Sequence, residues 1–284
     1  MSTAKIIYII GAGRSGTTLL DILLGNQDVV FSAGELNRFL KRDGVPHSAR
    51  DKEALQFWEN VSREIECDFA SLKSSAHKLE YHTGWFKQVF LNNKEIFKYE
   101  DFNRKLFKAI SRQLKADKII VDSSKYPMRA KHLSRIFKDR VSFIYVQRNP
   151  LDVVTSFGKK DVEQPSKGRI AANVYLFAVN VLAKIIFNRL KRTHSCSVVS
   201  YDELVTEPKQ VFRKLSSDLN IDFFQVQQKF DKNEKFQVGW LFDGNRLRLK
   251  NEIALKLKRN DKKGTGSVLN SILLRVHSFF WFKY

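Results

Sequence analysis

The chain has 284 residues, 43% of them hydrophobic and 12% aromatic, a composition that excludes a mainly disordered protein. Its 50 basic and 30 acidic residues give a net charge of +20, so an anionic partner is expected: a nucleic acid, a phosphorylated cofactor, an acidic polymer or a membrane surface. The only cysteines, Cys67 and Cys196, have no metal-binding spacing and exclude a disulfide framework. Both are interpreted as buried, reduced thiols.

Short apolar runs alternate with helical patterns along the chain. Strands are predicted at residues 5–10, 29–31, 118–121, 141–146 and 197–200. Helices are predicted at residues 17–24, 128–137, 151–157, 170–190 and 209–219. Apolar strands that alternate with helices predict an α/β fold of three layers, in which helices cover both faces of a central parallel sheet.

Residues 1–284 are predicted to form a single domain, because no linker or repeat interrupts them. Residues from about 53 to 113 read as a helical, charge-rich insertion packed beside the sheet. Residues 229–284 carry 13 basic and 5 acidic side chains and end in a predicted aromatic helix or tail. The longest apolar stretch, residues 170–183, is shorter than the ~20 residues that span a membrane, and is interpreted as a buried helix. Since no signal peptide is recognised, a cytoplasmic location is expected.

A glycine-rich loop follows the first predicted strand and opens the first predicted helix. Its glycines, Gly11, Gly13 and Gly16, let backbone N–H groups face an anion at the positive end of a helix. They match the GxGxxG pattern of dinucleotide-binding folds, in which Glu35 would bind a ribose. Gly11 and Gly16 also have the spacing of a nucleoside triphosphatase loop, but Thr17 replaces the lysine of that motif.

The run from Arg14 to Leu20, with the sequence RSGTTLL, resembles the 5′-phosphosulfate loop of sulfotransferases that use 3′-phosphoadenosine 5′-phosphosulfate (PAPS). A second segment resembles the 3′-phosphate motif of the same family: Arg148 ends a predicted strand and Ser156 lies about two helical turns later. The resemblance implies that PAPS is bound by Gly13, Arg14, Ser15, Gly16, Thr17, Thr18, Arg148 and Ser156.

Two later segments extend the resemblance to about residue 248. The stretch around Tyr201 resembles the family's strand and the Tyr-Glu-Asp-Leu-type segment that follows it, which implies that Tyr201 either stacks near the nucleotide or packs in the core. The run Gly244-Asn-Arg-Leu-Arg248 resembles a glycine–arginine segment that closes over the donor. Arg246 is the better candidate for donor binding in this segment, and Arg248 is interpreted as solvated. Residues 53–113 match the family weakly.

Two residues are assigned to catalysis. Glu35, in a Gly-Glu segment after the second strand, resembles the glutamate base of carbohydrate and tyrosylprotein sulfotransferases. Lys125 stands where relatives carry a lysine or histidine that faces the transferring group, so it is expected to stabilise charge on the bridging oxygen. Asp122 is the alternative base, and none of the six histidines is assigned to catalysis.

The resemblance therefore predicts an enzyme that transfers a sulfuryl group from PAPS to a hydroxyl or amine, without a metal, and releases adenosine 3′,5′-bisphosphate. The glutamate base and the basic surface favour a carbohydrate acceptor, as a glycan or glycolipid, and allow peripheral contact with a membrane. A basic nucleic-acid-binding protein is the alternative of a different class, and a dinucleotide-dependent oxidoreductase is a third interpretation.

Overall fold

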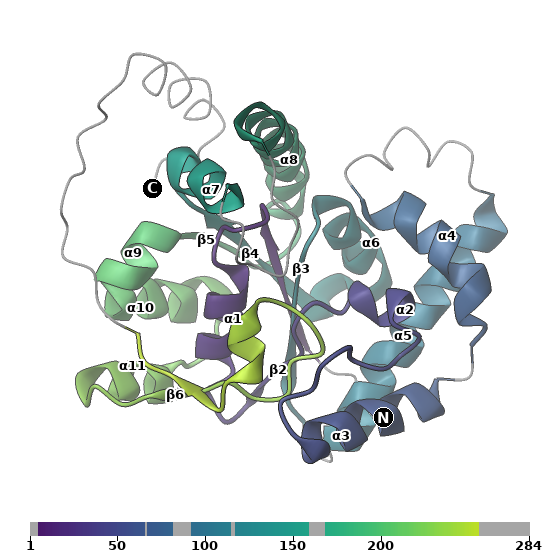
Figure 1. Cartoon of the computed structure of the whole chain (residues 1–284), viewed down its shortest axis with the longest axis horizontal. Helices are drawn as coiled ribbons and strands as arrows, with labels where there is room; N and C mark the ends of the chain where they lie inside the picture. Colours follow the sequence, from purple (N-terminus) through teal and green to yellow (C-terminus); the bar gives the residue numbers. More distant parts are fainter. Residues whose placement is uncertain (1–4, 66, 82–91, 115–116, 159–167, 256–284) are drawn as a thin grey trace.

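A five-stranded parallel sheet lies at the centre of the described part of the chain. The computed structural model describes residues 5–65, 67–81, 92–114, 117–158 and 168–255. The strand order is β2-β3-β1-β4-β5 (Figure 1). The strands are β1 (Ile6–Gly11), β2 (Val30–Ser32), β3 (Ile119–Lys125), β4 (Val141–Gln147) and β5 (Cys196–Ser200). The predicted α/β fold with its parallel sheet is confirmed.

Alternate side chains of the central strand enter two different cores. Tyr8 and Ile10 pack with residues of α6 and α8 on one face of the sheet, while Ile7 and Ile9 pack with residues of α1 and α10 on the other. This two-residue period is the signature of a strand buried on both faces. The covering helices are α1 (Thr17–Leu24), α6 (Pro127–Phe137), α8 (Arg169–Leu190) and α10 (Pro208–Leu219).

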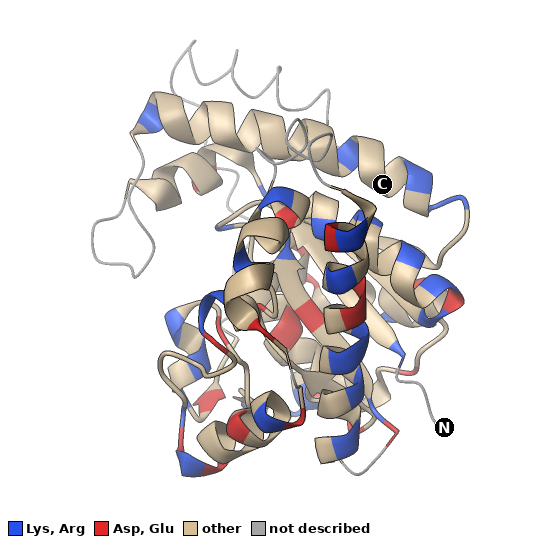
Figure 2. Ribbon diagram, turned by 90° about the vertical axis from the view of Figure 1, so that its right-hand side faces the viewer, with Lys and Arg blue, Asp and Glu red and all other residues tan. Residues whose placement is uncertain are grey.

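The predicted helical insertion forms a group of helices beside the sheet, on the right of Figure 1. It consists of α2 (Arg38–Lys41), α3 (Lys52–Glu64), α4 (Phe69–Glu80) and α5 (Asn93–Leu114). The remaining elements are α7 (Pro150–Phe157), α9 (Tyr201–Thr206), α11 (Phe224–Asp231), β6 (Phe236–Gln237), β7 (Glu252–Ile253) and the short 3-10 helices η2 (Lys138–Arg140) and η3 (Arg246–Leu249). Figure 2 shows that basic residues are spread over many of these elements. The predicted aromatic helix or tail at 256–284 lies outside the described residues.

A buried polar network ties the insertion to the sheet. Arg129 of α6 donates from Nε to Asp122 Oδ2 of β3 at 2.9 Å and from Nη1 to Glu80 Oε1 of α4 at 2.6 Å. Tyr99 of α5 donates its hydroxyl to the same Glu80 oxygen at 2.7 Å. Burial of Glu80 raises the pKa of its carboxyl, and the adjacent guanidinium lowers it. Since Arg129 pairs with both carboxylates, these charges are tolerated in the interior.

Strand β3 is longer than the sequence analysis predicts. The prediction ends the strand at residue 121, because Asp-Ser-Ser-Lys follows, but the strand runs through Lys125. These polar residues are buried because each has a partner: Asp122 bonds to Arg129 and Ser124, and Ser123 bonds to Asp21 of α1. Paired polar groups can continue a central strand where apolar patterning stops.

Two burial predictions are wrong. The stretch 170–183 lies in α8, and only one face of that helix is buried, because α6, α7 and the sheet cover it from one side. Cys67 and Cys196 are free thiols, as expected, but both are half-buried rather than buried. Desolvation raises the pKa of the Cys196 thiol to about 12, so it is kept protonated at neutral pH.

Candidate active site

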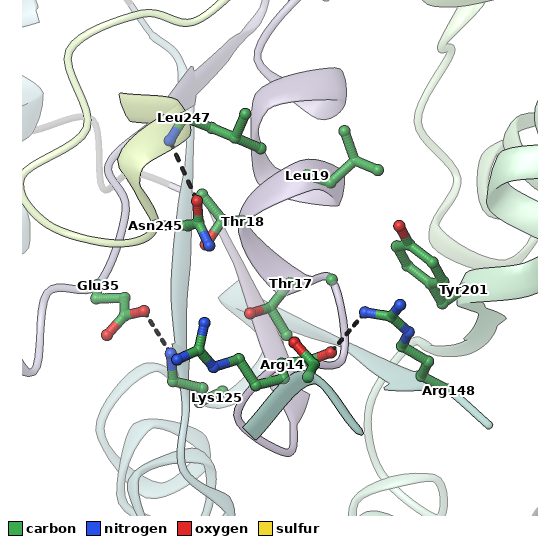
Figure 3. A pocket seen from close by; sticks show the side chains of 12 residues that line it. Arg14, Thr17, Thr18, Leu19, Glu35, Lys125, Arg148, Tyr201, Asn245 and Leu247 are labelled. Carbon is green, nitrogen blue, oxygen red and sulfur yellow. Dashed lines mark hydrogen bonds and ion pairs between the residues drawn. The ribbon is translucent and has the colours of Figure 1, made fainter. Parts of the chain in front are cut away.

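Each of the five parallel strands brings one side chain to the same edge of the sheet. Glu35 follows β2, Lys125 ends β3, Arg14 follows β1, Arg148 follows β4, and Tyr201 follows β5. Neighbouring strands lie ~4.8 Å apart, so the strand order arranges these residues in a row along the edge. Figure 3 shows Glu35 and Lys125 on one side of the pocket, and Arg148 and Tyr201 on the other.

A single pocket joins these five side chains. It is lined by Arg14, Gly16, Thr17, Thr18, Leu19, Glu35, Lys125, Arg148, Ser156, Tyr201, Asn245 and Leu247. Three of these side chains are cationic and one is anionic. The pocket therefore suits a ligand that carries several negative charges.

The glycine loop presents the start of α1 to this pocket. Helix α1 begins at Thr17, after Gly16 with φ 98°, and no side chain caps its N-terminus. The first N–H groups of a helix have no partner within it and carry the positive end of its dipole. Arg14 also adopts a left-handed conformation, with φ 68°, which is uncommon for a side-chain-bearing residue and typical of functional loops.

Gly16 leaves room for the ring of Tyr201. A Cβ atom at position 16 would lie 2.3 Å from Cδ2 of Tyr201, far inside van der Waals contact. The loop and the aromatic ring therefore approach each other closely, and only glycine allows both this approach and the positive φ.

We expect Gly16→Ala to displace Tyr201, to destabilise the fold by about 1–3 kcal/mol and to weaken nucleotide binding. Denaturant unfolding and titration calorimetry with adenosine 3′,5′-bisphosphate measure the two effects. Gly239→Ala is the matched control: Gly239 has a similar φ of +72°, but a Cβ atom there would lie more than 4 Å from its described surroundings. Equal losses in both variants would mean that backbone conformation, and not the Tyr201 contact, requires glycine.

Arg148 bridges the loop and Tyr201. Its guanidinium stacks over the Tyr201 ring at 4.2 Å, and Nη1 donates to the carbonyl oxygen of Arg14 at 2.9 Å. Its Nε is buried and has no hydrogen-bond partner among the described residues. A buried donor without a partner is costly, so this nitrogen is available for an anionic ligand.

Glu35 and Lys125 form a buried ion pair at the opposite side of the pocket. Lys125 Nζ donates to Glu35 Oε1, and Arg38 Nε lies 3.6 Å from Glu35 Oε2. The backbone fixes both residues: the Glu35 N–H donates to the Asp243 carbonyl at 3.0 Å, and Lys125 is held at φ 65°. A strained lysine conformation beside a buried carboxylate is typical of a functional site.

Asp21 of α1 connects the two segments that carry this ion pair. Its Oδ2 accepts from the Gly34 N–H at 3.1 Å and from the Ser123 hydroxyl at 2.6 Å. Gly34 precedes Glu35, and Ser123 is two residues before Lys125. Burial raises the pKa of the Asp21 carboxyl to about 7.

The pKa of Asp21 predicts a pH dependence of stability. A carboxyl whose pKa is higher in the folded state stabilises the fold fully at low pH, and this contribution is lost as the pH rises through 7. The loss reaches about 4 kcal/mol, since one pKa unit corresponds to ~1.4 kcal/mol. Asp21→Asn keeps an acceptor for Gly34 and Ser123 but does not titrate. Its free energy of unfolding should therefore rise relative to the parent between pH 4 and pH 8.

Urea unfolding of both proteins across this range measures the difference, and a difference independent of pH would contradict the prediction. The parent must be compared with Asp21→Asn, because a second buried group, His132, changes the stability of both proteins in the opposite direction as the pH rises. Desolvation lowers the pKa of His132 to about 3, so this residue makes the fold more stable as the pH rises.

The structure places most of the predicted site residues in the pocket, but not all of them. Gly13 and Ser15 do not line it: the Gly13 N–H donates to the Tyr175 hydroxyl at 3.0 Å, and Ser15 Oγ donates to the Ala12 carbonyl at 2.7 Å. Arg246 is exposed outside the pocket. Arg248, interpreted as solvated, is instead buried and donates from Nη1 to the Gly244 carbonyl at 3.0 Å.

Asp122, the alternative base, is fully buried in the network with Arg129 and does not line the pocket. Its Oδ1 accepts from the Ser124 N–H at 2.9 Å. A carboxylate committed to these partners and closed to the pocket cannot take a proton from a bound acceptor. Glu35 is the carboxylate that lines the pocket.

Three kinds of residue that contribute to the site are not predicted by the sequence motifs. Tyr175 supports the loop from α8, 162 positions away, and no sequence signal connects it to Gly13. Asn245 and Leu247, the two neighbours of Arg246, line the pocket. Both belong to the Gly244–Arg248 segment that resembles the donor-closing segment of the family. Asp21 is the one polar residue that is buried in the middle of α1, and an acidic residue in an apolar helical stretch is a signal that could have been used.

Comparison with known proteins agrees with this geometry. The model of the sulfotransferase family matches residues 7–225, which contain the glycine loop, Arg148, Ser156 and the Glu35–Lys125 pair. The chain belongs to the sulfotransferase family. It is an enzyme of that family, a transferase of sulfuryl groups. Comparison with curated protein sequences gave no match.

Solved sulfotransferase structures share the fold. The sulfotransferase domain from the curacin biosynthetic pathway is 19% identical, with a TM-score of 0.56, and the match covers 98% of each chain. The sulfotransferase domain of the Synechococcus PCC 7002 olefin synthase is 17% identical, with a TM-score of 0.52, over 100% of this chain and 98% of that one. Sulfotransferase STF9 from Mycobacterium avium is 10% identical, with a TM-score of 0.50, over 82% and 68% of the two chains.

The family model establishes the family, and the solved structures share the fold. Neither supports the predicted carbohydrate or tyrosylprotein subtype. No group of three or more His, Cys, Asp or Glu side chains in the described ranges is placed to hold a metal ion.

Proposed function

We propose that the protein transfers a sulfuryl group from PAPS to a hydroxyl-bearing acceptor and releases adenosine 3′,5′-bisphosphate. One observation carries this proposal: the uncapped start of α1, the guanidinium of Arg148 and the buried Glu35–Lys125 ion pair lie in one row along the carboxyl edge of the sheet. The loop after β1 is in the middle of this row. Arg148 and Ser156 lie on one side of it, and Glu35 and Lys125 lie on the other.

The row suits the shape of the donor. The uncapped start of α1, with Thr17 and Thr18, would hold the 5′-phosphosulfate as a helix N-terminus holds phosphate. Arg148 and Ser156 would hold the 3′-phosphate, which a bidentate guanidinium recognises well. The exposed part of the Tyr201 ring offers a surface for the nucleotide base.

The Glu35–Lys125 pair is at the position of the transferring group. With the donor bound, we expect Lys125 to turn from Glu35 to the bridging oxygen, where it stabilises the charge that develops on the leaving phosphate. Glu35 would then be free to accept the acceptor's proton. The acceptor oxygen forms the new S–O bond, the S–O bond to the phosphate breaks, and its electron pair stays on adenosine 3′,5′-bisphosphate. Positioning and electrostatics supply most of the rate in such transfers.

The proposed acceptor is a hydroxyl of a glycan or glycolipid. The support is chemical: a hydroxyl of low acidity needs a base such as Glu35, and the basic helix α2 begins beside that base. Arg38 contacts Glu35, and the pKa of Lys41 is lowered by the charge of Arg38, by desolvation and by the charge of Arg42. This basic helix favours an acceptor that carries negative charge.

Sulfuryl transfer from labelled PAPS to a panel of glycans, glycolipids, peptides and small hydroxyl compounds tests the proposal. We expect label in at least one hydroxyl acceptor and binding of adenosine 3′,5′-bisphosphate in calorimetry. Absence of both, together with a mobility shift of nucleic acid at physiological salt, would overturn it in favour of a nucleic-acid-binding protein.

Transfer is expected to continue in the presence of EDTA. Arg14 and Lys125 line the pocket and place positive charge where a divalent ion would otherwise neutralise phosphate. The measurement is turnover of labelled PAPS with EDTA and with added magnesium. Loss of all turnover in EDTA, restored by magnesium alone, would contradict this expectation.

A further inference from the structure

Asp21 differs from the other buried acidic residues of the described chain. Each of the others forms an ion pair: Glu35 with Lys125, Glu80 and Asp122 with Arg129, and Asp243 with Arg42. Asp21 is fully buried, and no basic side chain within the described ranges forms an ion pair with it. A carboxyl in the interior is costly unless hydrogen bonds replace those that it made to water. The hydrogen bonds of Asp21 therefore indicate what this residue does.

Two hydrogen bonds of the Asp21 carboxyl come from the segments that carry the acid–base pair. One donor, the N–H of Gly34, directly precedes Glu35. The other, the hydroxyl of Ser123, lies two residues before Lys125. The Ser123 N–H also donates to the Gly34 carbonyl at 2.9 Å, so the two segments are joined directly to each other. They form one unit, and Asp21 attaches this unit to α1.

Helix α1 carries the start of the proposed donor site. Thr17, in its first turn, lines the pocket, and Figure 3 shows it with Glu35 and Lys125 to one side. Asp21 follows Thr17 by four residues, so it lies on the same side of the helix, one turn or ~5.4 Å further along. The Asp21 carboxyl therefore fixes the distance between the uncapped start of α1 and the acid–base pair.

The backbone of Lys125 needs support of this kind. A side-chain-bearing residue in the left-handed region, here with φ 65°, persists only where its surroundings hold it. The bond from Ser123 to Asp21 holds the strand before Lys125. After it, the Tyr8 hydroxyl donates to the Tyr126 carbonyl at 2.9 Å. Lys125 is thus held from both sides, and Asp21 is the support that comes from α1.

We propose that Asp21 is a positioning residue for sulfuryl transfer: its carboxyl holds Glu35 and Lys125 at the working distance from a donor bound at the start of α1. Asp21 is buried and does not line the pocket, so it acts through these two residues. The inference rests on the proposed function. A displacement of about 1 Å in an active site can slow a reaction ~10²-fold, so the effect belongs to kcat and not to nucleotide binding.

Asp21→Leu and Asp21→Asn together test the role of the carboxyl oxygen. Leucine is close in size to aspartate but accepts no hydrogen bond, so kcat should fall about 10- to 100-fold. Asparagine keeps an acceptor for both donors, so its kcat should stay within about threefold of the parent. Calorimetry should give both variants a Kd for adenosine 3′,5′-bisphosphate within about threefold of the parent. The Ser32 hydroxyl still bonds to the backbone carbonyl of residue 21 in each variant.

Ser123→Ala removes one of the two bonds and leaves Asp21 in place. We expect kcat to fall about tenfold, with little change in nucleotide affinity. Ser197→Ala is the matched control: Ser197 is a buried serine of β5 that donates to Asp218 Oδ2 at 2.6 Å and does not line the pocket. Its kcat should stay within about twofold of the parent. If circular dichroism shows that Asp21→Leu is unfolded, this pair of serine variants decides the question.

Four outcomes would overturn the proposal. The first is a parental kcat in folded Asp21→Leu or in Ser123→Ala. The second is a loss of nucleotide affinity as large as the loss of kcat, which would make Asp21 a support of the loop alone. The third is an equal loss in Asp21→Asn and Asp21→Leu, and the fourth is an equal loss in Ser197→Ala and Ser123→Ala. Failure of the proposed function is a different result, because the parent itself would then transfer no sulfuryl group.

Discussion

Glu35→Gln is expected to lower turnover by ~10²–10⁴, the usual contribution of a positioned general base. Glu35 is the carboxylate that lines the pocket, and its Oε1 contacts Lys125. Glutamine keeps the shape of the side chain and an oxygen for Lys125, but it cannot take a proton from the acceptor. Because the loop and Arg148 are unaltered, binding of adenosine 3′,5′-bisphosphate should stay within about twofold of the parent.

The pH profile separates loss of the base from a general disturbance of the site. The acidic limb of kcat/KM, which reports the free enzyme's base, should disappear in Glu35→Gln. Glu64→Gln provides a matched control, since Glu64 is a glutamate of α3 that is paired with Arg112 outside the pocket. Normal turnover in Glu35→Gln would assign the base to another group. Asp122→Asn is a poor test of whether Asp122 is that other base. It breaks the buried pair with Arg129 and should destabilise the fold by about 3–5 kcal/mol.

The sheet and the main site residues could be predicted because their signals are local. Parallel strands buried on both faces read as continuous apolar runs, and residues at the carboxyl ends of such strands converge on one edge. This geometry brings Glu35, Lys125, Arg14 and Arg148 together from four separate segments. The resemblance to sulfotransferases also predicts the order in which these segments follow one another along the chain. The match to the family model confirms the family.

The missing parts depend on contacts between distant positions. The polar end of β3 is buried because Asp122 meets Arg129 and Ser123 meets Asp21, and no local pattern predicts those partners. The choice between Arg246 and Arg248 depended on the direction of a single 3-10 turn, which exposes the first residue and buries the second. Likewise, an apolar helix does not itself reveal which of its faces the fold covers, and the burial of α8 was overestimated for this reason.

Arg148→Ala is expected to reduce affinity for adenosine 3′,5′-bisphosphate by about 2–5 kcal/mol, the usual loss when one partner of a buried charge pair is removed. This corresponds to a ~30- to 4,000-fold rise in Kd, since 1.4 kcal/mol is tenfold. Affinity for AMP, which has no 3′-phosphate, should change little. Selectivity between the two nucleotides, measured by calorimetry, should therefore collapse.

The AMP measurement distinguishes two roles that the structure gives to Arg148. The guanidinium lines the pocket and its Nε has no hydrogen-bond partner among the described residues, but its Nη1 also donates to the Arg14 carbonyl of the loop. If Arg148 acts only by supporting the loop, both nucleotides lose affinity equally, and the assignment of the 3′-phosphate is wrong. Arg140→Ala serves as the matched control, since Arg140 stacks on Phe137 at 5.7 Å outside the pocket. It should leave the affinity for both nucleotides unchanged, so a loss confined to the bisphosphate in Arg148→Ala identifies the 3′-phosphate site.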